Sequence, residues 1–535
     1  MHNTATRRTF LKLGLGGLTA LPLSGILTSV LPQGALAQAS TIRIALSAPP
    51  TTVDPHLQSN APNNALAMNI FDAIVTNDPT SKSVPGLASE WKVIDDTHWE
   101  FQLRPDVVFS DGTPVTVDDL IASLNRATTI ESTSSFRTYT RAIKTMSADG
   151  TKLLIETTGP EPLLPNSLSR IRIISAKYKD APSADFNSGK AAIGTGPFIL
   201  EQYVPGNRIT LVRNEKYWGE KPPYDRVELQ IISDDAARLA ALLSGDFDLI
   251  EEMPFSGVSR VKSSSDFKVI SGVSSRLVYM SMDQFRDVSP FIKDKSGKDL
   301  DKNPLKDVRV RKALSMAINR EGIVRQIMEG NAQAASQFLP KGAPGTSQDI
   351  DIEKYDVAAA KALLAEAGYP DGFRMTIHGP NDRYVNDGRI VQAVAQMLTR
   401  IGIDTTVEVM PWSVYAGRNG KSDFSFNLSS WGVNTGETSN PMTALTATPD
   451  KEKGLGGSNY GRYSNPKVDE TLAKAKATLD DTKRNELLGE NSKIIFTDHA
   501  ILPLHHEVVL VGAKKNVDYT TRADQYTLAS GVRKA

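Results

Sequence analysis

Residues 390–409 read IVQAVAQMLTRIGIDTTVEV, and they indicate the fold class of this chain more clearly than any other stretch. Apolar residues recur at helical spacing as far as Ile401, which predicts a helix with one apolar face. Gly402 then ends the helix, and the apolar residues after it alternate as they do in a strand. The same succession recurs over residues 358–377. Two consecutive helix–glycine–strand units predict an α/β protein in which helices pack on a sheet.

Shorter signals extend this pattern towards the N-terminus. Residues 99–103 and 226–232 alternate apolar and polar side chains, which predicts two strands. Thr116 is a candidate N-cap for a following helix, and residues 235–243 form a helical segment that Gly245 ends. Helix and strand signals alternate throughout, without low-complexity segments or internal repeats, so we expect two or three α/β lobes.

The first 37 residues predict export. Arg7 and Arg8 precede an uncharged run over residues 13–42, and the small-x-small pattern of a signal peptidase site ends at Ala37. Paired arginines are typical of the twin-arginine export route, so residues 1–37 are predicted to be a signal peptide that is cleaved after Ala37. The alternative is an uncleaved membrane anchor, since a run of this length could nearly span a bilayer. The glycine, proline and serine content argues against the anchor.

Composition narrows the classes of partner and chemistry. The 61 basic and 61 acidic residues balance, without a cluster of Lys and Arg, so nucleic acid is a poor candidate partner. The chain has no cysteine, which excludes disulfides, a thiol nucleophile, zinc–thiolate sites and lipid attachment at a cysteine. No later segment reaches 18 consecutive apolar residues. We therefore expect a mature protein that is free in the periplasm and needs no cofactor.

Motifs spread through the whole chain carry a family resemblance. They are Thr52–His56, Pro85–Trp91, Phe101–Pro105, Phe109–Pro114, Gly194–Phe198, Arg213–Gly219, Leu242–Asp248, Asp307–Ala313, Ala317–Arg320 and Tyr463–Pro466. In this order they resemble the extracellular solute-binding proteins of family 5. This is the dipeptide-, oligopeptide- and nickel-binding class that feeds ABC importers.

The resemblance implies a two-lobed periplasmic-binding-protein fold of type II, in the large cluster with an extra subdomain. Lobe I would comprise residues 38–280, lobe II residues 281–505, and residues 506–535 would return to lobe I. The chain would cross between lobes near residues 279–283 and 501–509, and these two crossings would form a hinge that closes on the solute. A monomer would capture a peptide or a peptide-like small polar solute and deliver it to an inner-membrane ABC permease.

The first candidate site is the loop that follows the strand at residues 375–377. Arg383 offers a planar fork for a carboxylate, Asn381 can donate and accept hydrogen bonds, and Tyr384 has a flat apolar face with a polar tip. Asp382 belongs to the same candidate set. Loops at strand ends bind solutes in α/β proteins. The alternative is that Arg383 pairs with Asp382 or Asp387 as a solvated loop charge.

The second candidate site is residues 429–434, which follow a predicted strand at 424–428. Trp431 either lines the pocket or belongs to the core. At one position the chain differs from the family pattern: dipeptide binders of the family carry an aspartate where this chain has Asn434. Asparagine brings no charge to an α-ammonium group, so the change weakens the case for dipeptides. Longer peptides, modified peptides, amino-acid conjugates and sugars stay open.

Metal and catalytic interpretations find little support. His505, His506 and Glu507 are the only local cluster of metal-capable side chains, but two ligands on one strand face do not make a site. Chelated nickel stays open, since nickel binders of the family capture the chelate. No nucleophile elbow, zinc helix or dinucleotide turn is present, and residues 456–463 lack the Lys and Ser/Thr of a phosphate loop. We therefore expect a binding protein. A secreted hydrolase and a chaperone or chemosensory partner are the alternatives.

Overall fold

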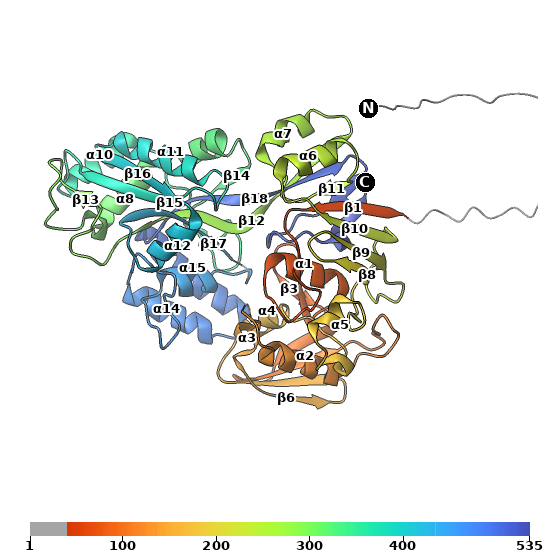
Figure 1. Ribbon diagram of the computed structural model, residues 1–535. Helices are drawn as coiled ribbons and strands as arrows, with labels where there is room; N and C mark the ends of the chain where they lie inside the picture. Colours follow the sequence, from red (N-terminus) through yellow and green to blue (C-terminus); the bar gives the residue numbers. More distant parts are fainter. Residues whose placement is uncertain (1–39, 134, 434) are drawn as a thin grey trace, which may run out of the picture. The chain divides into compact units, whose positions relative to one another are not determined.

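The described residues are built around one large mixed sheet. The computed structural model describes residues 40–535, apart from positions 134 and 434. The sheet has twelve strands and both parallel and antiparallel neighbours, in agreement with the predicted α/β class (Figure 1). Ten strands follow in the order β13 (Ile292–Lys293), β15 (Arg374–Pro380), β17 (Phe426–Gly432), β12 (Phe267–Met282), β18 (Leu502–Lys514), β11 (Leu249–Ile250), β1 (Thr41–Leu46), β10 (Arg226–Ile231), β9 (Arg208–Arg213) and β8 (Phe198–Val204), while β16 (Asp404–Met410) pairs with β15 and β14 (Ala332–Ala334) pairs with β18.

A separate four-stranded antiparallel sheet forms what we call the subdomain, with its own core. Its strands are β4 (Ala88–Val93), β5 (His98–Leu103), β7 (Lys152–Thr157) and β6 (Ile143–Asp149), in that order, and the hairpins β2 (Val75–Asn77)–β3 (Ser83–Pro85) and β19 (Val517–Tyr519)–β20 (Val532–Lys534) complete the strands. Helix α2 (Val117–Thr129) packs on the subdomain core. Thr116 starts this helix through a capping box with Asp119, as its sequence predicts.

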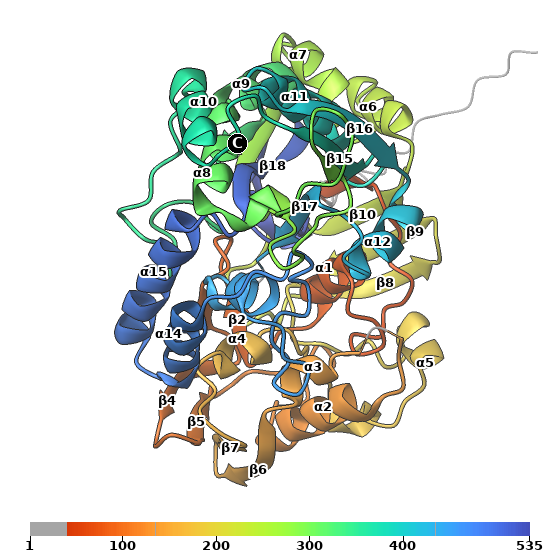
Figure 2. The same cartoon turned by 90° about the vertical axis from the view of Figure 1, so that its left-hand side faces the viewer.

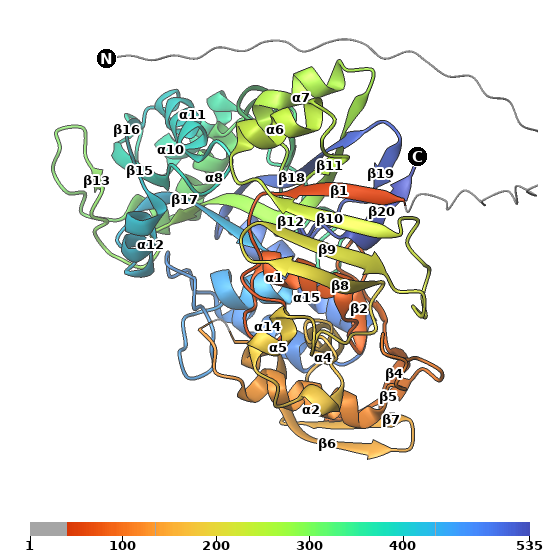
Figure 3. The same ribbon diagram turned by 45° about the vertical axis from the view of Figure 1, so that its right-hand side comes forward.

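Helices pack on both sheets (Figure 3). In the first half of the chain, α1 (Ala61–Ile70), α5 (Ser183–Asn187), α6 (Asp235–Leu243) and α7 (Phe255–Lys262) pack in cores of the large sheet. The short helices α3 (Arg137–Thr140) and α4 (Leu164–Leu168) pack on the subdomain core. The second half supplies α8 (Val308–Ala317), α9 (Arg320–Gly322), α10 (Val357–Glu366), α11 (Asp387–Thr399), α12 (Trp412–Gly420), α13 (Ser439–Pro441), α14 (Pro466–Ala477) and α15 (Asp481–Thr497). Short 3-10 turns lie at Ala176–Tyr178, Pro304–Lys306 and Ala529–Gly531, and π turns at Ile323–Ile327 and Met442–Thr446.

The two longest strands, β12 and β18, run antiparallel and belong to two different cores. Their ladder is regular up to the pair Val273–Val508 and resumes at the pair Leu277–His506. Between these pairs, three residues of β12 face only Glu507 of β18, which is a bulge that bends and twists the ladder. On one side of the bulge Phe267 packs with α6 and α7. On the other side the two strands pack with α8 and α11.

The local sequence predictions agree well with the structure, with one correction. The predicted helices and strands at 235–243, 358–377 and 390–409 are confirmed as α6, α10–β15 and α11–β16. The predicted end of the strand at residue 428 is wrong, because β17 continues to Gly432 through pairing with β12. The predicted signal peptide, residues 1–37, lies outside the described residues. The lobe boundaries 38–280, 281–505 and 506–535 stay a prediction.

Candidate functional site

A cavity of about 550 Å³ lies at the bulge between β12 and β18, and we call it the hinge cavity. Strand β18 lines it through residues 508–510, and β12 contributes Arg276. The segment 252–256 that begins α7 closes one side. The loop 383–385 that precedes α11 closes the other side. The cavity is therefore lined by residues from both sides of the bulge, where β12 and β18 pass from the core with α6 and α7 to the core with α8 and α11.

A polar cluster at the bulge gives this cavity its fixed charges. Arg276 Nε lies 3.5 Å from Glu507 Oε2, and Gln525 Nε2 donates to the same oxygen at 3.3 Å. Arg276 Nη1 also donates to Ser430 Oγ at 3.3 Å, which ties the cluster to β17. Burial raises the pKa of Glu507, while the guanidinium groups of Arg276 and Arg383 oppose this shift. The bulge thus holds an ion pair of fixed geometry in a partly desolvated site.

Arg383 lies on the side of the hinge cavity that is formed by the loop before α11, and its guanidinium group is not paired with a carboxylate in the described residues. The backbone N–H groups of Arg383 and Tyr384 donate to Asp387 Oδ2 at 2.9 and 3.0 Å, so Asp387 shapes the loop. The Arg383 guanidinium lies 5.1 Å from the centre of the Trp412 ring. Within the described part of the chain it forms no ion pair with Asp382 or Asp387. Its planar fork is therefore available to a carboxylate.

The neighbouring candidates have different surroundings. Tyr384 also lines the hinge cavity, its ring packs edge-on to Trp412 at 6.1 Å, and burial raises its pKa to about 12. Asp382 Oδ1 accepts the Trp412 N–H at 2.7 Å, which satisfies a donor in the first turn of α12. Asn381 is exposed at the end of β15, where its backbone N–H donates to Met410. The structure thus brings Arg383 and Tyr384 into the cavity.

The second candidate segment does not line the hinge cavity in the described residues. Trp431 lies within β17, packs against the core that contains α14 and α15, and donates from Nε1 to Asn440 Oδ1 at 2.9 Å. Asn434 lies outside the described residues.

Glu252 is a cavity residue that the sequence did not single out. Its side chain is exposed, and it forms no ion pair in the described part of the chain. Its φ of 44° lies in the left-handed region, which is uncommon for a residue with a side chain. Arg238 Nη2 donates to the Glu252 carbonyl at 2.9 Å and so supports this conformation. The cavity therefore has one available carboxylate and one available guanidinium on its two sides.

No group of three or more metal-capable side chains occurs within the described residues. His505 and His506 are buried, and both ring nitrogens of His505 have no hydrogen-bond partner in the structure. Burial lowers the pKa of His505 to about 4 and that of His506 to about 3. These histidines are therefore neutral near pH 7 and pack inside the strand layer.

Comparison with known families decides the class of the protein. Residues 82–453 match the model of the bacterial extracellular solute-binding proteins, family 5 (middle region). The chain belongs to this family. As a member of family 5 it is a solute-binding protein rather than an enzyme.

Relatives of this family 5 protein cover nearly its whole length. The dipeptide-binding protein of Escherichia coli (strain K12) is 24% identical over 94% of this chain and 95% of its own. Heme-binding protein A of Haemophilus influenzae is 24% identical over 83% of both chains. The unliganded open form of the MppA periplasmic murein tripeptide-binding protein superposes with a TM-score of 0.79, at 22% identity, over 93% of this chain and 98% of the other. These matches confirm the predicted periplasmic-binding-protein fold.

None of the helices in the described part of the chain combines the length and the hydropathy that crossing a membrane requires.

Proposed function

We propose that this family 5 protein is the periplasmic component of an ABC importer and captures a peptide or a peptide-like small polar solute. In this proposal the two lobes close on the solute, and the closed protein delivers it to the membrane permease as a monomer. The proposed route to the periplasm is twin-arginine export with cleavage after Ala37. Several relatives support a peptide or a peptide-like solute, since they are dipeptide-, murein peptide- and glutathione-binding proteins.

The observation that carries the proposal is the pair of available charges in the hinge cavity. A free peptide is a zwitterion, with an ammonium group at one end and a carboxylate at the other. Arg383 would hold the carboxylate with two parallel hydrogen bonds, and Glu252 would hold the ammonium group. Arg383 and Glu252 both interact electrostatically with Glu507: the Arg383 guanidinium lowers the pKa of Glu507, and the Glu252 carboxylate raises it. This arrangement favours a ligand with separated opposite charges over a neutral sugar.

The size of the cavity supports a short ligand. Its volume of about 550 Å³ lies within the range of roughly 300–1,000 Å³ that is typical of small-molecule sites. Tyr384, Met253 and Phe255 supply apolar surface beside the charges. In this proposal Asn381, Asp382 and Asn434 complete the candidate ligand set, while Trp431 supports the core that contains α14 and α15. Asn434 would contribute a neutral hydrogen bond, which would leave the ammonium group to Glu252.

A thermal-shift panel tests the proposal directly. The protein, residues 38–535, is heated with di- to tetrapeptides, N-acetylated and C-amidated forms of the same peptides, sugars, amino-acid conjugates and chelated nickel. A ligand that binds only the folded state raises the midpoint by mass action. We expect a concentration-dependent rise with free peptides or a peptide-like zwitterion, and a smaller rise when either end is blocked. Equal shifts with free and doubly blocked peptides, or a shift with sugars alone, would contradict the proposal.

Two variants connect this binding to the cavity. Arg383→Ala and Glu252→Gln should each reduce the midpoint rise with free peptides. Arg389→Ala is the matched control, because Arg389 is an exposed arginine of α11 that lies outside the residues lining the hinge cavity. Unchanged peptide shifts in both cavity variants would remove the solute from this cavity.

A further inference from the structure

A cavity of about 1040 Å³ separates the subdomain from the first turn of α15, and we call it the subdomain cavity. The β2–β3 hairpin lines one wall through residues 79–83, and Trp91 and Trp99 extend that wall. Residues 435–437 and the start of α15 line the opposite wall. In Figure 2, α14 and α15 lie beside β4 and β5. The two walls stand on separate cores, which are the subdomain core and the core that contains α14 and α15.

Leu479 connects these two cores. It lies in the short loop between α14 and α15, and both helices pack in their own core through residues such as Leu472 and Leu488. Leu479 instead packs against the subdomain core. Among residues 466–497 of the described chain, it is the one apolar side chain in that core. The apolar contact between these two helices and the subdomain core thus depends on a single leucine.

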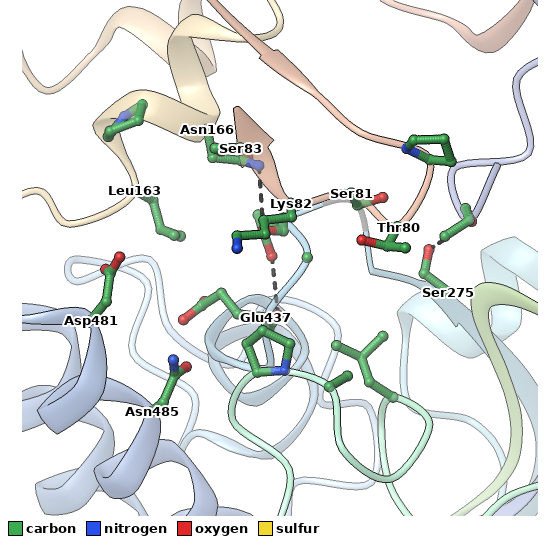
Figure 4. Close-up of a pocket in the computed structure, with 18 of the residues that line it drawn as sticks. Thr80, Ser81, Lys82, Ser83, Leu163, Asn166, Ser275, Glu437, Asp481 and Asn485 are labelled. Carbon is green, nitrogen blue, oxygen red and sulfur yellow. Dashed lines mark hydrogen bonds between the residues drawn. The ribbon is translucent and has the colours of Figure 1, made fainter. Parts of the chain in front are cut away.

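The segment 435–437 meets the β2–β3 hairpin at a second contact. Gly436 has a φ of 72°, and a Cβ atom there would lie 2.4 Å from the Ser81 carbonyl oxygen. Only glycine therefore allows the two backbones to lie so close. Asn166 Nδ2 of the subdomain donates to the neighbouring Thr435 carbonyl at 3.3 Å. Figure 4 shows Ser81 and Asn166 on one side of the cavity and Glu437 on the other.

Opposite charges also face each other across the two sides. Glu161 follows β7 in the subdomain, and Lys476 lies in the last turn of α14. Partial burial raises the pKa of Glu161, and the charges of Arg141 and Lys476 oppose this rise. The attraction between Glu161 and Lys476 therefore favours contact between the two cores.

An interface of this kind can open. Two units with cores of their own are expected to move relative to each other unless the interface between them is large and apolar. Here a cavity of about 1040 Å³ lies within the interface, and the apolar contact of α14 and α15 is one leucine. The contacts of Leu479 and Gly436 therefore decide how firmly the two walls stay together.

We propose that Leu479 and Gly436 form a latch that holds the subdomain against the α14–α15 core when no solute is bound. Leu479 anchors the loop 478–480 in the subdomain core, and Gly436 lets the segment 435–437 lie against the Ser81 carbonyl. The open arrangement is then the minor state of the free protein. This inference goes beyond the proposed function, in which the solute closes the lobes, because the latch acts before any solute arrives.

Thiol labelling of the solute-free protein measures how often the latch opens. The chain has no cysteine, so Ser81→Cys introduces a single thiol at a position that is 2% exposed and lies against Gly436. A thiol reagent reaches this position when the walls separate, so the labelling rate follows the open population. Lys82→Cys, at the exposed neighbouring position, gives the rate for an uncovered thiol. We expect the Ser81→Cys thiol to react about a hundredfold more slowly, which corresponds to an open population of about 1%.

Breaking the latch should accelerate this labelling. Leu479→Ala removes the apolar contact, and Gly436→Ala forces a Cβ atom against the Ser81 carbonyl; each should raise the labelling rate of the Ser81→Cys thiol about tenfold. Leu487→Ala is the matched control for the leucine, because Leu487 packs in the core of α14 and α15. Gly454→Ala is the control for the glycine, since its φ is 66° and a Cβ atom there meets nothing within 4 Å. Neither control should change the rate.

The outcomes separate a latch from local or general loosening. Unchanged labelling in folded Leu479→Ala protein would show that only the hairpin moves and would overturn the proposal. Equal acceleration by Leu479→Ala and Leu487→Ala would overturn it as well, because general destabilisation would then explain both. So would a Ser81→Cys thiol that reacts as fast as that of Lys82→Cys.

A spin-label pair keeps the test valid if Ser81→Cys does not fold. Thr151→Cys in the β6–β7 turn and Lys483→Cys on α15 are both exposed positions. Leu479→Ala should add longer distances between the labels that Leu487→Ala does not add, and identical distributions would overturn the latch. No solute takes part in either measurement, so a failure of every peptide to bind would overturn the proposed function alone.

Discussion

The hinge cavity and the subdomain cavity differ in how their buried polar groups are satisfied. In the hinge cavity, Glu507 is paired with Arg276 and hydrogen-bonded by Gln525, and the two available charges stand on exposed loop positions. The subdomain cavity, of about 1040 Å³, lies between the subdomain and the first turn of α15. In it Arg484 pairs with both Glu437 and Asp481, while Trp99 Nε1 and Arg484 Nη1 are buried without partners in the structure. The first cavity therefore offers two unpaired charges, whereas the buried arginine of the second cavity is already paired with two carboxylates.

This difference reflects the elements that build each cavity. The hinge cluster stands on β12, β18 and the C-terminal segment, whose backbone pairing fixes the side chains before any ligand arrives. The subdomain cavity lies where the subdomain core meets the core of α14 and α15, and its ion pairs join side chains of α15 with each other and with the loop before α13. Strand pairing thus positions the charges of the hinge cavity, whereas side-chain ion pairs position those of the subdomain cavity.

Acid should perturb the strand that supports the hinge cavity, and it is the largest effect that we expect. Burial holds the pKa of His505 near 4 and that of His506 near 3, below the usual 6.5. As pH falls from 6.5 to 4, the unfolded chain binds protons that the folded chain does not, so the free energy of unfolding falls. The loss is about 3 kcal/mol for each histidine. Urea denaturation at pH 7, 5.5 and 4.5 measures it.

Glu507 acts in the opposite direction, because burial raises its pKa and the folded state then binds the extra proton. The variant His506→Leu isolates the histidine contribution, since it removes one titrating group from both states. Its unfolding free energy should depend less steeply on pH between 6.5 and 4 than that of the parent protein. An identical slope in the two proteins would show that β18 does not carry the acid sensitivity.

Removing Arg484 should cost more stability than removing any charge of the hinge cavity. Arg484→Met leaves the carboxylate of Glu437 buried, where burial already raises its pKa. Breaking one side of a buried ion pair typically costs about 3–5 kcal/mol. Urea denaturation should show this loss in the free energy of unfolding. The matched control is Lys493→Met. Lys493 is also on α15, and its exposed ion pair is with Asp349 outside the helix, so this variant should leave the urea midpoint nearly unchanged. Equal stability of both variants would contradict the assignment of a buried pair.

Arg383→Ala should act on affinity instead of stability, which sharpens the contrast between the cavities. The side chain is exposed, so its loss should leave the unfolding free energy nearly unchanged. Solute affinity should fall by about 1.5–3 kcal/mol, the range for hydrogen bonds to charged groups. Calorimetric titration with the peptide that raises the thermal midpoint measures this change. Unchanged affinity in a folded Arg383→Ala protein would end the proposed role of Arg383, and Arg389→Ala provides the reference.

Local signals in the sequence predicted individual elements well. Helix α6 begins and ends where its sequence indicates, because Asp234 accepts the Ala237 N–H at 2.8 Å and Gly245 follows with a φ of 84°. Arg383 and Tyr384 could be selected because a polar loop follows a clear strand. These features depend on residues that are near one another in the chain.

Pairing between distant segments could not be predicted in this way. The serines after Leu428 interrupt the apolar alternation, yet β17 continues because Trp431 pairs with Leu277 of β12. Arg276 meets Glu507 only through the bulge in the ladder, and the sequence offered Glu507 as a possible metal ligand beside two histidines. Trp99 was predicted as a strand residue, and nothing nearby in the chain indicates that its indole N–H is buried without a hydrogen-bond partner in the structure.

The smallest effect that we expect concerns Trp431. A role in the core and a role in the solute site predict different results for its replacement. Trp431→Phe keeps an aromatic ring in the core but loses the hydrogen bond from Nε1 to Asn440 Oδ1. The free energy of unfolding should fall by about 0.5–1.5 kcal/mol, and Asn440→Ala in a double-mutant cycle should show a coupling of similar size. Since Trp431 lines neither cavity in the described residues, the affinity for the solute should not change. A loss of solute affinity without a loss of stability would instead place the indole in the solute site, and the solute would then extend from the hinge cavity along β17.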